Sequence, residues 1–327
     1  MNFEDRLLNV NETSFEEIAL QIFQYQATHN LVYAEFLKNL STEPAKIKSL
    51  DHIPHMPVEV FKYRELKTGT WIPQTYFESS GTTKQYLAKH LIRSLDWYHF
   101  IAKNCFECHF GSLSNFTFSA LLPGYLERKH SSLVNMVQYF MDESGSQNKG
   151  AFFINEFNAL QSFLKMNSGN KVPVLFGVRF ALLDFADHFP GDYSGLHIIE
   201  TGGMKGRRRE VSNEDFLEDM YSKMKGIRMI GEYGMTELTS QAYALEPQKF
   251  RAAPWLKFSV TNPTIPGIPL SVGQRGCIRI VDLANINTCS FLQTSDMGVI
   301  SSDGSLQILG RLDSSESRGC GLLYEDS

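Results

Sequence analysis

Short apolar runs alternate with helix-like stretches between residues 75 and 235. The runs are bounded by Gly, Pro or Asn and cover 116–122, 150–154, 172–177, 196–200 and 227–233. The stretches with helical periodicity lie near 91–107, 131–141, 157–166, 179–188 and 212–225. Apolar strands that alternate with helices predict a mainly parallel sheet covered by helices on both faces. The fold class is therefore predicted as α/β.

Three polar segments follow the ends of predicted strands, at 79–84, 201–207 and 232–237. In open α/β sheets, ligands bind where the loops leave the carboxyl ends of the strands. The pattern therefore predicts that these three segments face a ligand.

The remaining parts of the chain differ in character. Residues 1–75 are predicted as a helical N-terminal region, where Ser14 at the N-cap and Glu17 at N3 form a capping box. Residues 76–250 are predicted as the α/β nucleotide-binding core. Residues 251–327 are predicted as a small β-rich subdomain, an antiparallel sheet or barrel with a turn at Asp303-Gly304. We expect the three parts to form one structural unit.

Composition limits the possible functions. The chain has 327 residues and a net charge of −5, which argues against a nucleic-acid binder. It contains no apolar leader with a basic flank and no long apolar run, so we expect neither a signal peptide nor stable membrane insertion. Five cysteines without an export signal are typical of reduced thiols, which predicts a cytoplasmic location.

Cys105, Cys108 and His109 match the C-x-x-C-H pattern of c-type haem attachment. The motif lies at the end of a helix-like run, and no further ligands with zinc-site spacing accompany it. We interpret the two cysteines as free and largely buried in a helix.

The segment from Ser79 to Lys84 predicts an anion-binding loop. An apolar, strand-like lead enters a cluster of hydroxyl residues around one glycine, and Lys84 adds a positive charge. Hydroxyls and free backbone N–H groups at such a turn can cradle phosphate, although most such clusters are ordinary turns. The candidate phosphate ligands are Ser79, Ser80, Gly81, Thr82, Thr83 and Lys84.

Further motifs follow this loop in a fixed order: Gly-Glu-Tyr-Gly-Met-Thr-Glu at 231–237, Thr-Ser-Asp-Met-Gly at 294–298 and Gly-Arg-Leu-Asp at 310–313. Together the four segments resemble the adenylate-forming superfamily of acyl-CoA synthetases, luciferases and peptide-synthetase adenylation domains. The resemblance implies the fold of the N-terminal domain of those enzymes. It also implies ATP and Mg²⁺ as cofactors, and a reaction in which a carboxylate joins the α-phosphate and pyrophosphate leaves.

The resemblance implies a role for each motif. Glu237 would bind Mg²⁺ through its hard carboxylate oxygens, and Thr236 would hydrogen-bond the α-phosphate. Asp296 would accept hydrogen bonds from the ribose hydroxyls, and Arg311 would contact the ribose or the phosphates. In the glycine-rich segment, Gly202 and Gly203 would let the backbone approach adenine, and Lys205 is a candidate catalytic residue. The resemblance thus gives Thr236, Glu237 and Lys205 as catalytic candidates.

Each motif also has a simpler interpretation. Glu237 is compatible with a helix start, and Asp296 with a turn, because Asp-x-Gly is common in turns. Arg311 and Asp313 are compatible with a surface ion pair of little energetic weight. The basic run at 207–209 is compatible with a solvated surface.

Other passages narrow the resemblance. Residues 121–128, 131–134, 201–207 and 316–320 are similar to the acyl-protein synthetases of the LuxE type, and this similarity runs from about residue 55 onward. It implies that a fatty acid is activated as acyl-AMP, passed to a cysteine of the synthetase and then to a partner protein such as a reductase or carrier. Cys320 is the candidate cysteine: it stands between two glycines, and Arg318 would favour its thiolate. A packing role for Cys320 is the alternative.

The sequence also departs from the superfamily pattern. Lys84-Gln85 replaces the usual Gly-Pro-Lys continuation of the loop, and the sequence ends before the C-terminal domain and catalytic lysine of most adenylating enzymes. Two other functions therefore stay open. One is an acyltransferase that takes acyl groups from a thioester without ATP, and the other is a non-catalytic nucleotide-binding scaffold subunit.

Overall fold

The computed structural model describes residues 6–79, 86–123, 130–145, 151–166, 170–202, 212–265 and 267–311. The chain forms two compact units. The first unit contains Met1–Tyr98, Thr236–Ser240 and Arg251–Ser327, and the second contains His99–Met235 and Gln241–Phe250. Within the described residues, no helix is both long enough and apolar enough to cross a membrane.

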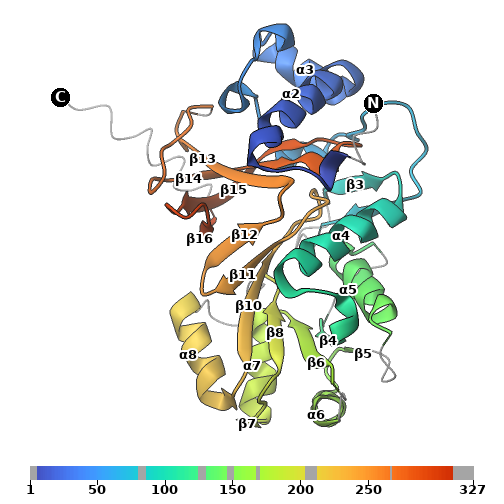
Figure 1. Cartoon of the computed structure of the whole chain (residues 1–327), viewed down its shortest axis with the longest axis vertical. Helices are drawn as coiled ribbons and strands as arrows, with labels where there is room; N and C mark the ends of the chain where they lie inside the picture. The colour runs from blue at the N-terminus through green and yellow to red at the C-terminus, as the bar shows by residue number, and fades with distance from the viewer. Residues whose placement is uncertain are drawn as a thin grey trace, which may run out of the picture. The chain divides into compact units, whose positions relative to one another are not determined.

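The second unit contains a mainly parallel sheet, in the order β11-β10-β8-β6-β4-β5 (Figure 1). Strands β4, β5, β6, β8 and β10 run parallel, and β11 pairs antiparallel with β10. This confirms the α/β prediction and the predicted strand positions. The strands are β4 (Phe116–Leu121), β5 (Ala151–Phe153), β6 (Val172–Gly177), β8 (His197–Glu200), β10 (Arg228–Tyr233) and β11 (Ala242–Glu246), with a separate pair β7 (Gly191–Asp192) and β9 (Met224–Lys225).

The helices between these strands also lie where the apolar periodicity predicts them. Strand order runs in one direction from β4 to β5 and in the other direction from β6 through β8 to β10. Because crossover connections are right-handed, this reversal places α5 on one face of the sheet and α7 and α8 on the other (Figure 1). The helices are α4 (Leu95–Phe110), which the unit boundary divides, α5 (Ser132–Glu143), α6 (Phe157–Lys165), α7 (Arg179–His188) and α8 (Asn213–Lys223).

An aromatic core joins the helices α4 and α5 to the sheet. The rings of Phe106 on α4 and Phe118 on β4 are 5.5 Å apart, and Phe118 lies 5.6 Å from Phe140 on α5. Phe140 also lies 6.2 Å from Phe176 on β6. All four side chains are buried, so packing of these large rings fixes the helices against the strands.

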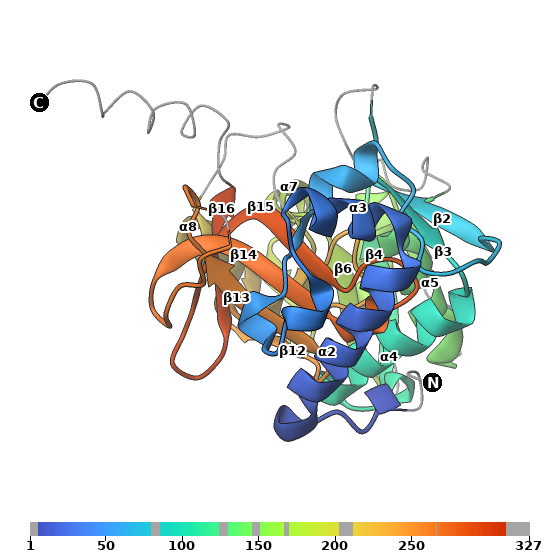
Figure 2. The ribbon, with the colours of Figure 1, turned by 90° about the horizontal axis from the view of Figure 1, so that it is seen from above.

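The first unit contains an antiparallel sheet in the order β13-β14-β15-β16, with β1 added in parallel to β15. The predicted small antiparallel sheet is therefore present (Figure 2). The predicted turn at Asp303-Gly304 lies between β15 and β16. The strands are β1 (Met56–Pro57), β12 (Lys249–Ala252), which the unit boundary divides, β13 (Leu256–Thr261), β14 (Arg275–Asp282), β15 (Phe291–Ile300) and β16 (Leu306–Arg311). The helices are α2 (Glu12–His29), α3 (Leu31–Asn39) and the short η1 (Pro44–Lys46), η2 (Leu50–His52), η3 (Val58–Lys62) and η5 (Leu283–Asn285).

Two local predictions are wrong. Helix α2 begins earlier than predicted, with Asn11 as the N-cap and Ser14 at N3, because the Asn11 side chain already accepts the N–H groups of Thr13 and Ser14. Strand β2 (Thr75–Glu78), which precedes the predicted phosphate loop, does not belong to the parallel sheet. It pairs antiparallel with β3 (Lys89–Ile92) in a separate hairpin.

A buried carboxylate fixes the segment Thr236–Ser240 within the first unit. Asp282, at the end of β14, has no exposed surface and accepts hydrogen bonds from the backbone N–H groups of Thr239 and Ser240, both at 3.0 Å. It also accepts the Ser240 hydroxyl at 2.7 Å and the Ala284 N–H at 3.1 Å. Since every one of these donors is satisfied by the same side chain, Asp282 determines where the segment lies.

We expect Asp282→Ala to lower the free energy of unfolding by about 3 kcal/mol or more, because it leaves several buried donors without an acceptor. Urea denaturation of the full chain measures the change. As a control, Glu218→Ala on the exposed side of α8 should change the free energy by less than about 0.5 kcal/mol. A loss for Asp282→Ala that is no larger than for the control would show that the contact is not needed.

Candidate functional site

Glu237 lies in the anchored segment and is buried, with 8% of its surface exposed. Burial is the main cause that raises the pKa of its carboxyl group to about 7. The nearby carboxylate of Glu59 acts in the same direction, and Lys62 and Arg311 act in the opposite direction. No side chain among the described residues donates a hydrogen bond to this carboxylate. Glu237 therefore presents hard oxygen atoms that other side chains have not saturated.

Asp296 and Arg311 form an ion pair across two neighbouring strands. They are register partners on β15 and β16, and Arg311 Nε lies 2.8 Å from Asp296 Oδ1. The Asp296 side chain is 11% exposed, whereas that of Arg311 is 79% exposed. Because Asp296 lies within a strand, the turn interpretation of this residue is wrong. Asp313, the ion-pair partner of Arg311 in the simpler interpretation, lies outside the described residues.

The pairing of β15 with β16 is irregular next to Asp296. The register of β15 against β16 shifts between Met297 and Gly298. A Cβ atom on Gly298 would lie only 2.8 Å from the carbonyl oxygen of Gln307. Gly298 in the Asp-Met-Gly motif is therefore required by the packing of this bulge.

The first unit brings three sequence motifs together. Glu237 and Arg311, 74 positions apart in the sequence numbering, are close enough to affect each other electrostatically, and Arg311 binds Asp296. A third acidic residue, Glu59 on η3, joins them by accepting the Ser295 hydroxyl at 2.6 Å. The sequence interpretation missed Glu59, because nothing in its local pattern relates it to a strand more than 200 residues later.

Thr236 is held through its backbone. Nδ1 of the buried His90 on β3 donates to the Thr236 carbonyl oxygen at 2.8 Å, and Nε2 lies 2.9 Å from Thr288 Oγ1. The side-chain amide of Asn285 donates to the Glu237 carbonyl oxygen at 2.8 Å. These contacts orient the residues 236 and 237 from the backbone side, so that their side chains are not used for anchoring.

Ser79 is the only predicted phosphate ligand within the described residues. Its hydroxyl accepts the Ala88 N–H at 3.0 Å, and its own N–H donates to the Ala88 carbonyl at 3.0 Å. Ser79 and Ala88 thus continue the pairing of β2 and β3 beyond the pair formed by Glu78 and Lys89. The predicted ligands Ser80, Gly81, Thr82, Thr83 and Lys84 lie outside the described residues, as do Gly203, Lys205 and Cys320.

In the second unit, charged groups gather at the carboxyl ends of β8 and β10. Arg179 Nη2, at the start of α7, lies 3.3 Å from Glu200 Oε2. Burial raises the pKa of Glu232 to about 8, with a further contribution from the Glu200 carboxylate. The buried Thr201 hydroxyl has no hydrogen-bond partner within the described residues, and Gly202 follows with a φ of 86°. Thr201, Gly202 and Glu232 belong to the segments 201–207 and 232–237, which are predicted to face a ligand. Sequence reasoning missed Arg179 and Glu200, because isolated Arg and Glu residues carry no recognisable spacing.

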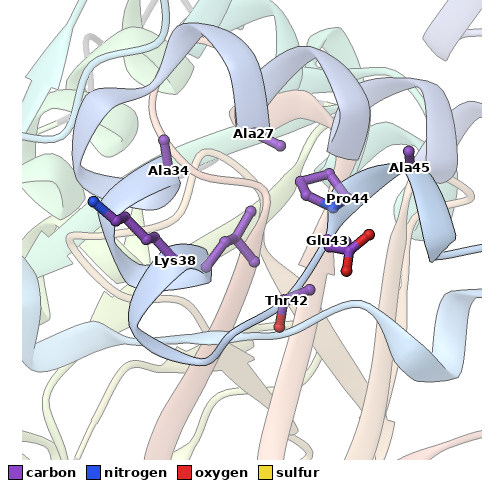
Figure 3. Close-up of a pocket in the computed structure, with 8 residues that line it drawn as sticks. Ala27, Ala34, Lys38, Thr42, Glu43, Pro44 and Ala45 are labelled. Atoms are coloured by element: carbon purple, nitrogen blue, oxygen red, sulfur yellow. The ribbon is translucent and has the colours of Figure 1, made fainter.

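Two cavities lie apart from the motifs of the first unit. A cavity of about 70 Å³ in the second unit includes Arg179, Glu200 and Phe216 in its lining. A wider groove of about 510 Å³ lies between α2, α3 and η1 (Figure 3). Its lining is mostly small and apolar, with Lys38 and Glu43 as its charged members. Neither contains a residue of the predicted catalytic set, so the motifs rather than the cavities define the candidate site.

The described cysteines are all free, as predicted. Cys105, Cys277 and Cys289 are buried, and burial raises the pKa of the Cys289 thiol to about 12. The prediction that both helix cysteines are largely buried is wrong for Cys108, which is exposed on α4. The three buried thiols have the character of structural rather than reactive cysteines.

Within the described ranges, no group of three or more His, Cys, Asp or Glu side chains has the arrangement of a metal site. Carboxylate oxygens such as those of Glu237 are ligands that Mg²⁺ accepts together with substrate phosphates.

The chain is similar to known ligases. It is 22% identical over 346 residues to the long-chain-fatty-acid–luciferin-component ligase of Aliivibrio fischeri, a match that covers 95% of this chain and 89% of that protein. No family model matches the chain.

Solved structures share its fold. 2-Hydroxyisobutyryl-CoA ligase in complex with its acyl-AMP and CoA aligns with a TM-score of 0.68 and 14% identity, over 93% of this chain and 68% of that one. ATP-bound MatB from Rhodopseudomonas palustris aligns with a TM-score of 0.54 and 17% identity, over 72% of this chain. The chain spans about half of MatB, 47% of its length. At these identities the comparison establishes a common fold.

His90 predicts a pH dependence of stability. Burial lowers its pKa from 6.5 to about 4, so between these values the unfolded chain binds more protons than the folded chain. The stability associated with neutral His90 is therefore complete above pH 6.5 and is lost as the pH falls toward 4. We expect His90→Gln to cost about 1–3 kcal/mol at pH 7 through its lost hydrogen bonds, and to lose less stability on acidification.

Urea midpoints at several pH values between 4 and 7 measure this. If the wild type and His90→Gln lose stability equally as the pH falls, the acid sensitivity comes from other groups.

Proposed function

We propose that this chain, which has the fold of adenylate-forming ligases and resembles the LuxE-type acyl-protein synthetases, activates a carboxylic acid with ATP as acyl-AMP. The observation that carries the proposal is the meeting of Glu237, Asp296 and Arg311 in the first unit. These residues come from separate motifs of one superfamily pattern, and Arg311 pairs with Asp296. Asp282 and His90 bind the backbone of the segment that carries Glu237. The resemblance to a fatty-acid ligase over most of the chain supports the same reaction.

The side chains suit the charges of the substrates. Glu237 would hold Mg²⁺, which neutralises part of the triphosphate charge when bound. Thr236 leaves its hydroxyl for the α-phosphate, since its backbone carbonyl is what His90 binds. Asp296 would accept the ribose hydroxyls, and the well-exposed Arg311 beside it would meet ribose or phosphate oxygens.

The remaining sequence candidates complete the nucleotide site in this proposal. Ser79, Ser80, Gly81, Thr82, Thr83 and Lys84 would hold the β- and γ-phosphates, Gly202 and Gly203 would face adenine, and Lys205 would act near the reacting groups. The chemistry is mainly positioning and charge stabilisation, which is what an anchored backbone segment provides.

We further propose that the acid is a fatty acid and that the acyl group passes to the thiol of Cys320 and then to a reductase or carrier protein in the cytoplasm. In this step the thiolate sulfur attacks the acyl carbon, a thioester forms, and AMP leaves with the electron pair of the broken bond. Cys105, Cys277 and Cys289 are buried, and burial raises the pKa of the Cys289 thiol. These three thiols are therefore poor nucleophiles, which favours Cys320 as the acyl acceptor.

Exchange of labelled pyrophosphate into ATP in the presence of different carboxylic acids tests the proposal. We expect exchange that depends on a fatty acid. An acyltransferase that uses a thioester donor would show acyl transfer without exchange, and a non-catalytic scaffold would show neither.

Glu237→Gln should lower the exchange rate by roughly two orders of magnitude or more, because it removes a charge from the site that faces the triphosphate. Its unfolding midpoint should be close to that of the wild type, since the backbone contacts of Glu237 remain. The matched control is Glu218→Gln, an exposed carboxylate on α8. Exchange at the wild-type rate in Glu237→Gln would exclude the residue from the reaction.

Cys320→Ser should keep pyrophosphate exchange but lose the covalent acyl group, because a hydroxyl is a much weaker nucleophile than a thiolate at neutral pH. Mass spectrometry of the intact protein after incubation with ATP, Mg²⁺ and a fatty acid detects the adduct. Serine variants of Cys105, Cys108, Cys277 and Cys289 serve as controls and should still be labelled. An adduct that persists in Cys320→Ser would assign the thioester to another residue.

A further inference from the structure

The described residues of the connection between β13 and β14, 262–265 and 267–274, expose aliphatic side chains to water. We call these residues the apolar loop. Ile265 is 56% exposed, Ile268 is 47% exposed and Val272 is 60% exposed. The sequence has no charged residue between Lys257 and Arg275. A charge-free, aliphatic surface of this kind is unusual in a chain with 20% charged residues. Exposed apolar surfaces often bind another protein or a membrane.

The backbone of the apolar loop has few donors left for water. Pro263, Pro266 and Pro269 have no N–H group. The side-chain oxygen of Asn262 accepts the N–H groups of Thr264 and Ile265, and that of Gln274 accepts the N–H of Ser271. Further backbone bonds join Asn262 to Ile268, Leu270 to Val260, Gly273 to Ile300 and Gln274 to Ser271.

This internal pairing lowers the cost of moving the loop out of water. In a lipid environment every backbone N–H must find its partner within the protein, because no water is available to replace it. The apolar loop meets most of that requirement before any contact is made. Its bonds also connect it to β13 and β15, so the exposed side chains are presented by an ordered element rather than by one that must first be fixed.

The composition favours lipid over a protein partner. The energetically important residues of protein interfaces are mostly Trp, Tyr and Arg, and Leu and Val are under-represented among them. The described part of the apolar loop contains no aromatic residue, and its large exposed side chains are Ile and Val. Aliphatic side chains gain from insertion at the boundary of headgroups and acyl chains, in proportion to the apolar area that they bury there.

A cation stands at the base of the loop. Arg275, the first residue of β14, is exposed and makes no ion pair with the described residues. An arginine beside an apolar surface is placed to bind the phosphate of a lipid headgroup when the aliphatic residues insert. Apolar and electrostatic attraction would then act on neighbouring residues of the chain, since Arg275 is three positions from Val272.

We propose that the apolar loop docks this protein on an anionic lipid surface, with Ile265, Ile268 and Val272 inserted among the headgroups and Arg275 bound to lipid phosphate. The contact lies on the surface and does not span the bilayer. It is independent of the adenylation chemistry, and it would bring the protein to the phase in which a fatty acid is concentrated.

Co-sedimentation of the full chain with vesicles tests the proposal. Vesicles of phosphatidylcholine are compared with vesicles that also contain phosphatidylglycerol. We expect the wild type to bind the anionic vesicles, and the variant I265S/I268S/V272S to bind them about tenfold more weakly. Arg275→Gln should weaken binding to the anionic vesicles more than binding to pure phosphatidylcholine, because the choline group of the latter offsets the charge of its phosphate.

The matched control is L31S/L40S/I72S, which removes aliphatic side chains of 82%, 53% and 90% exposure elsewhere in the first unit. It should bind as the wild type does. Equal thermal midpoints of both triple variants and the wild type would show that folding is intact.

Several results would overturn the proposal. The proposal is wrong if the wild type sediments with neither kind of vesicle. It is also wrong if the loop variant and the control lose binding equally. Self-association of the wild type in sedimentation velocity, abolished in the loop variant and accompanied by no vesicle binding, would assign the apolar loop to contact between copies of the chain.

Discussion

The candidate site depends on the buried carboxylate of Asp282. A side chain with no exposed surface keeps its charge only if polar groups surround it, and here these are the N–H groups of residues 239, 240 and 284 and the Ser240 hydroxyl. The requirement acts in both directions: the carboxylate needs the donors, and the donors of the turn need an acceptor. Satisfying both fixes the segment that carries Glu237, a residue whose carboxylate takes no part in the anchoring.

In this site, backbone groups make the stabilising contacts and side chains remain available for a ligand. His90 and Asn285 bind the carbonyl oxygens of residues 236 and 237, so the side chains of Thr236 and Glu237 remain for a ligand. Asp296 differs, because its carboxylate pairs with Arg311 across two strands. That pair is open on the arginine side, where the side chain is 79% exposed, so a ligand can reach it without unfolding the sheet. The first unit thus combines the anchored backbone of residues 236 and 237 with the accessible charge of Arg311.

Much of the fold could be predicted, and the failures have physical causes. Burial on both faces made the strands at 116–121 and 172–177 visible as apolar runs, and helical periodicity marked α5 and α7. The N-cap of α2 was wrong because Asn11 and Ser14 are both good capping residues, and only the backbone geometry decides between them. The place of β2 was wrong because a short apolar strand looks the same in a hairpin as in a parallel sheet. The predicted division at residues 75 and 250 stays a prediction.

The sequence by itself determined the fold class, the order of the motifs and the residue types that suit phosphate, ribose and cation, because these depend on local pattern and on the chemistry of single side chains. It also determined that the segment 258–274 carries no charge. Only the tertiary structure decided which residues meet. Glu59 approaches Ser295, and Arg311 pairs with Asp296 rather than lying free on the surface. Burial raises the pKa of Glu232 to about 8, with a smaller contribution from Glu200. The reason is that burial and Coulomb interactions depend on distance in space, and residues far apart in the chain leave no trace of that distance in the sequence.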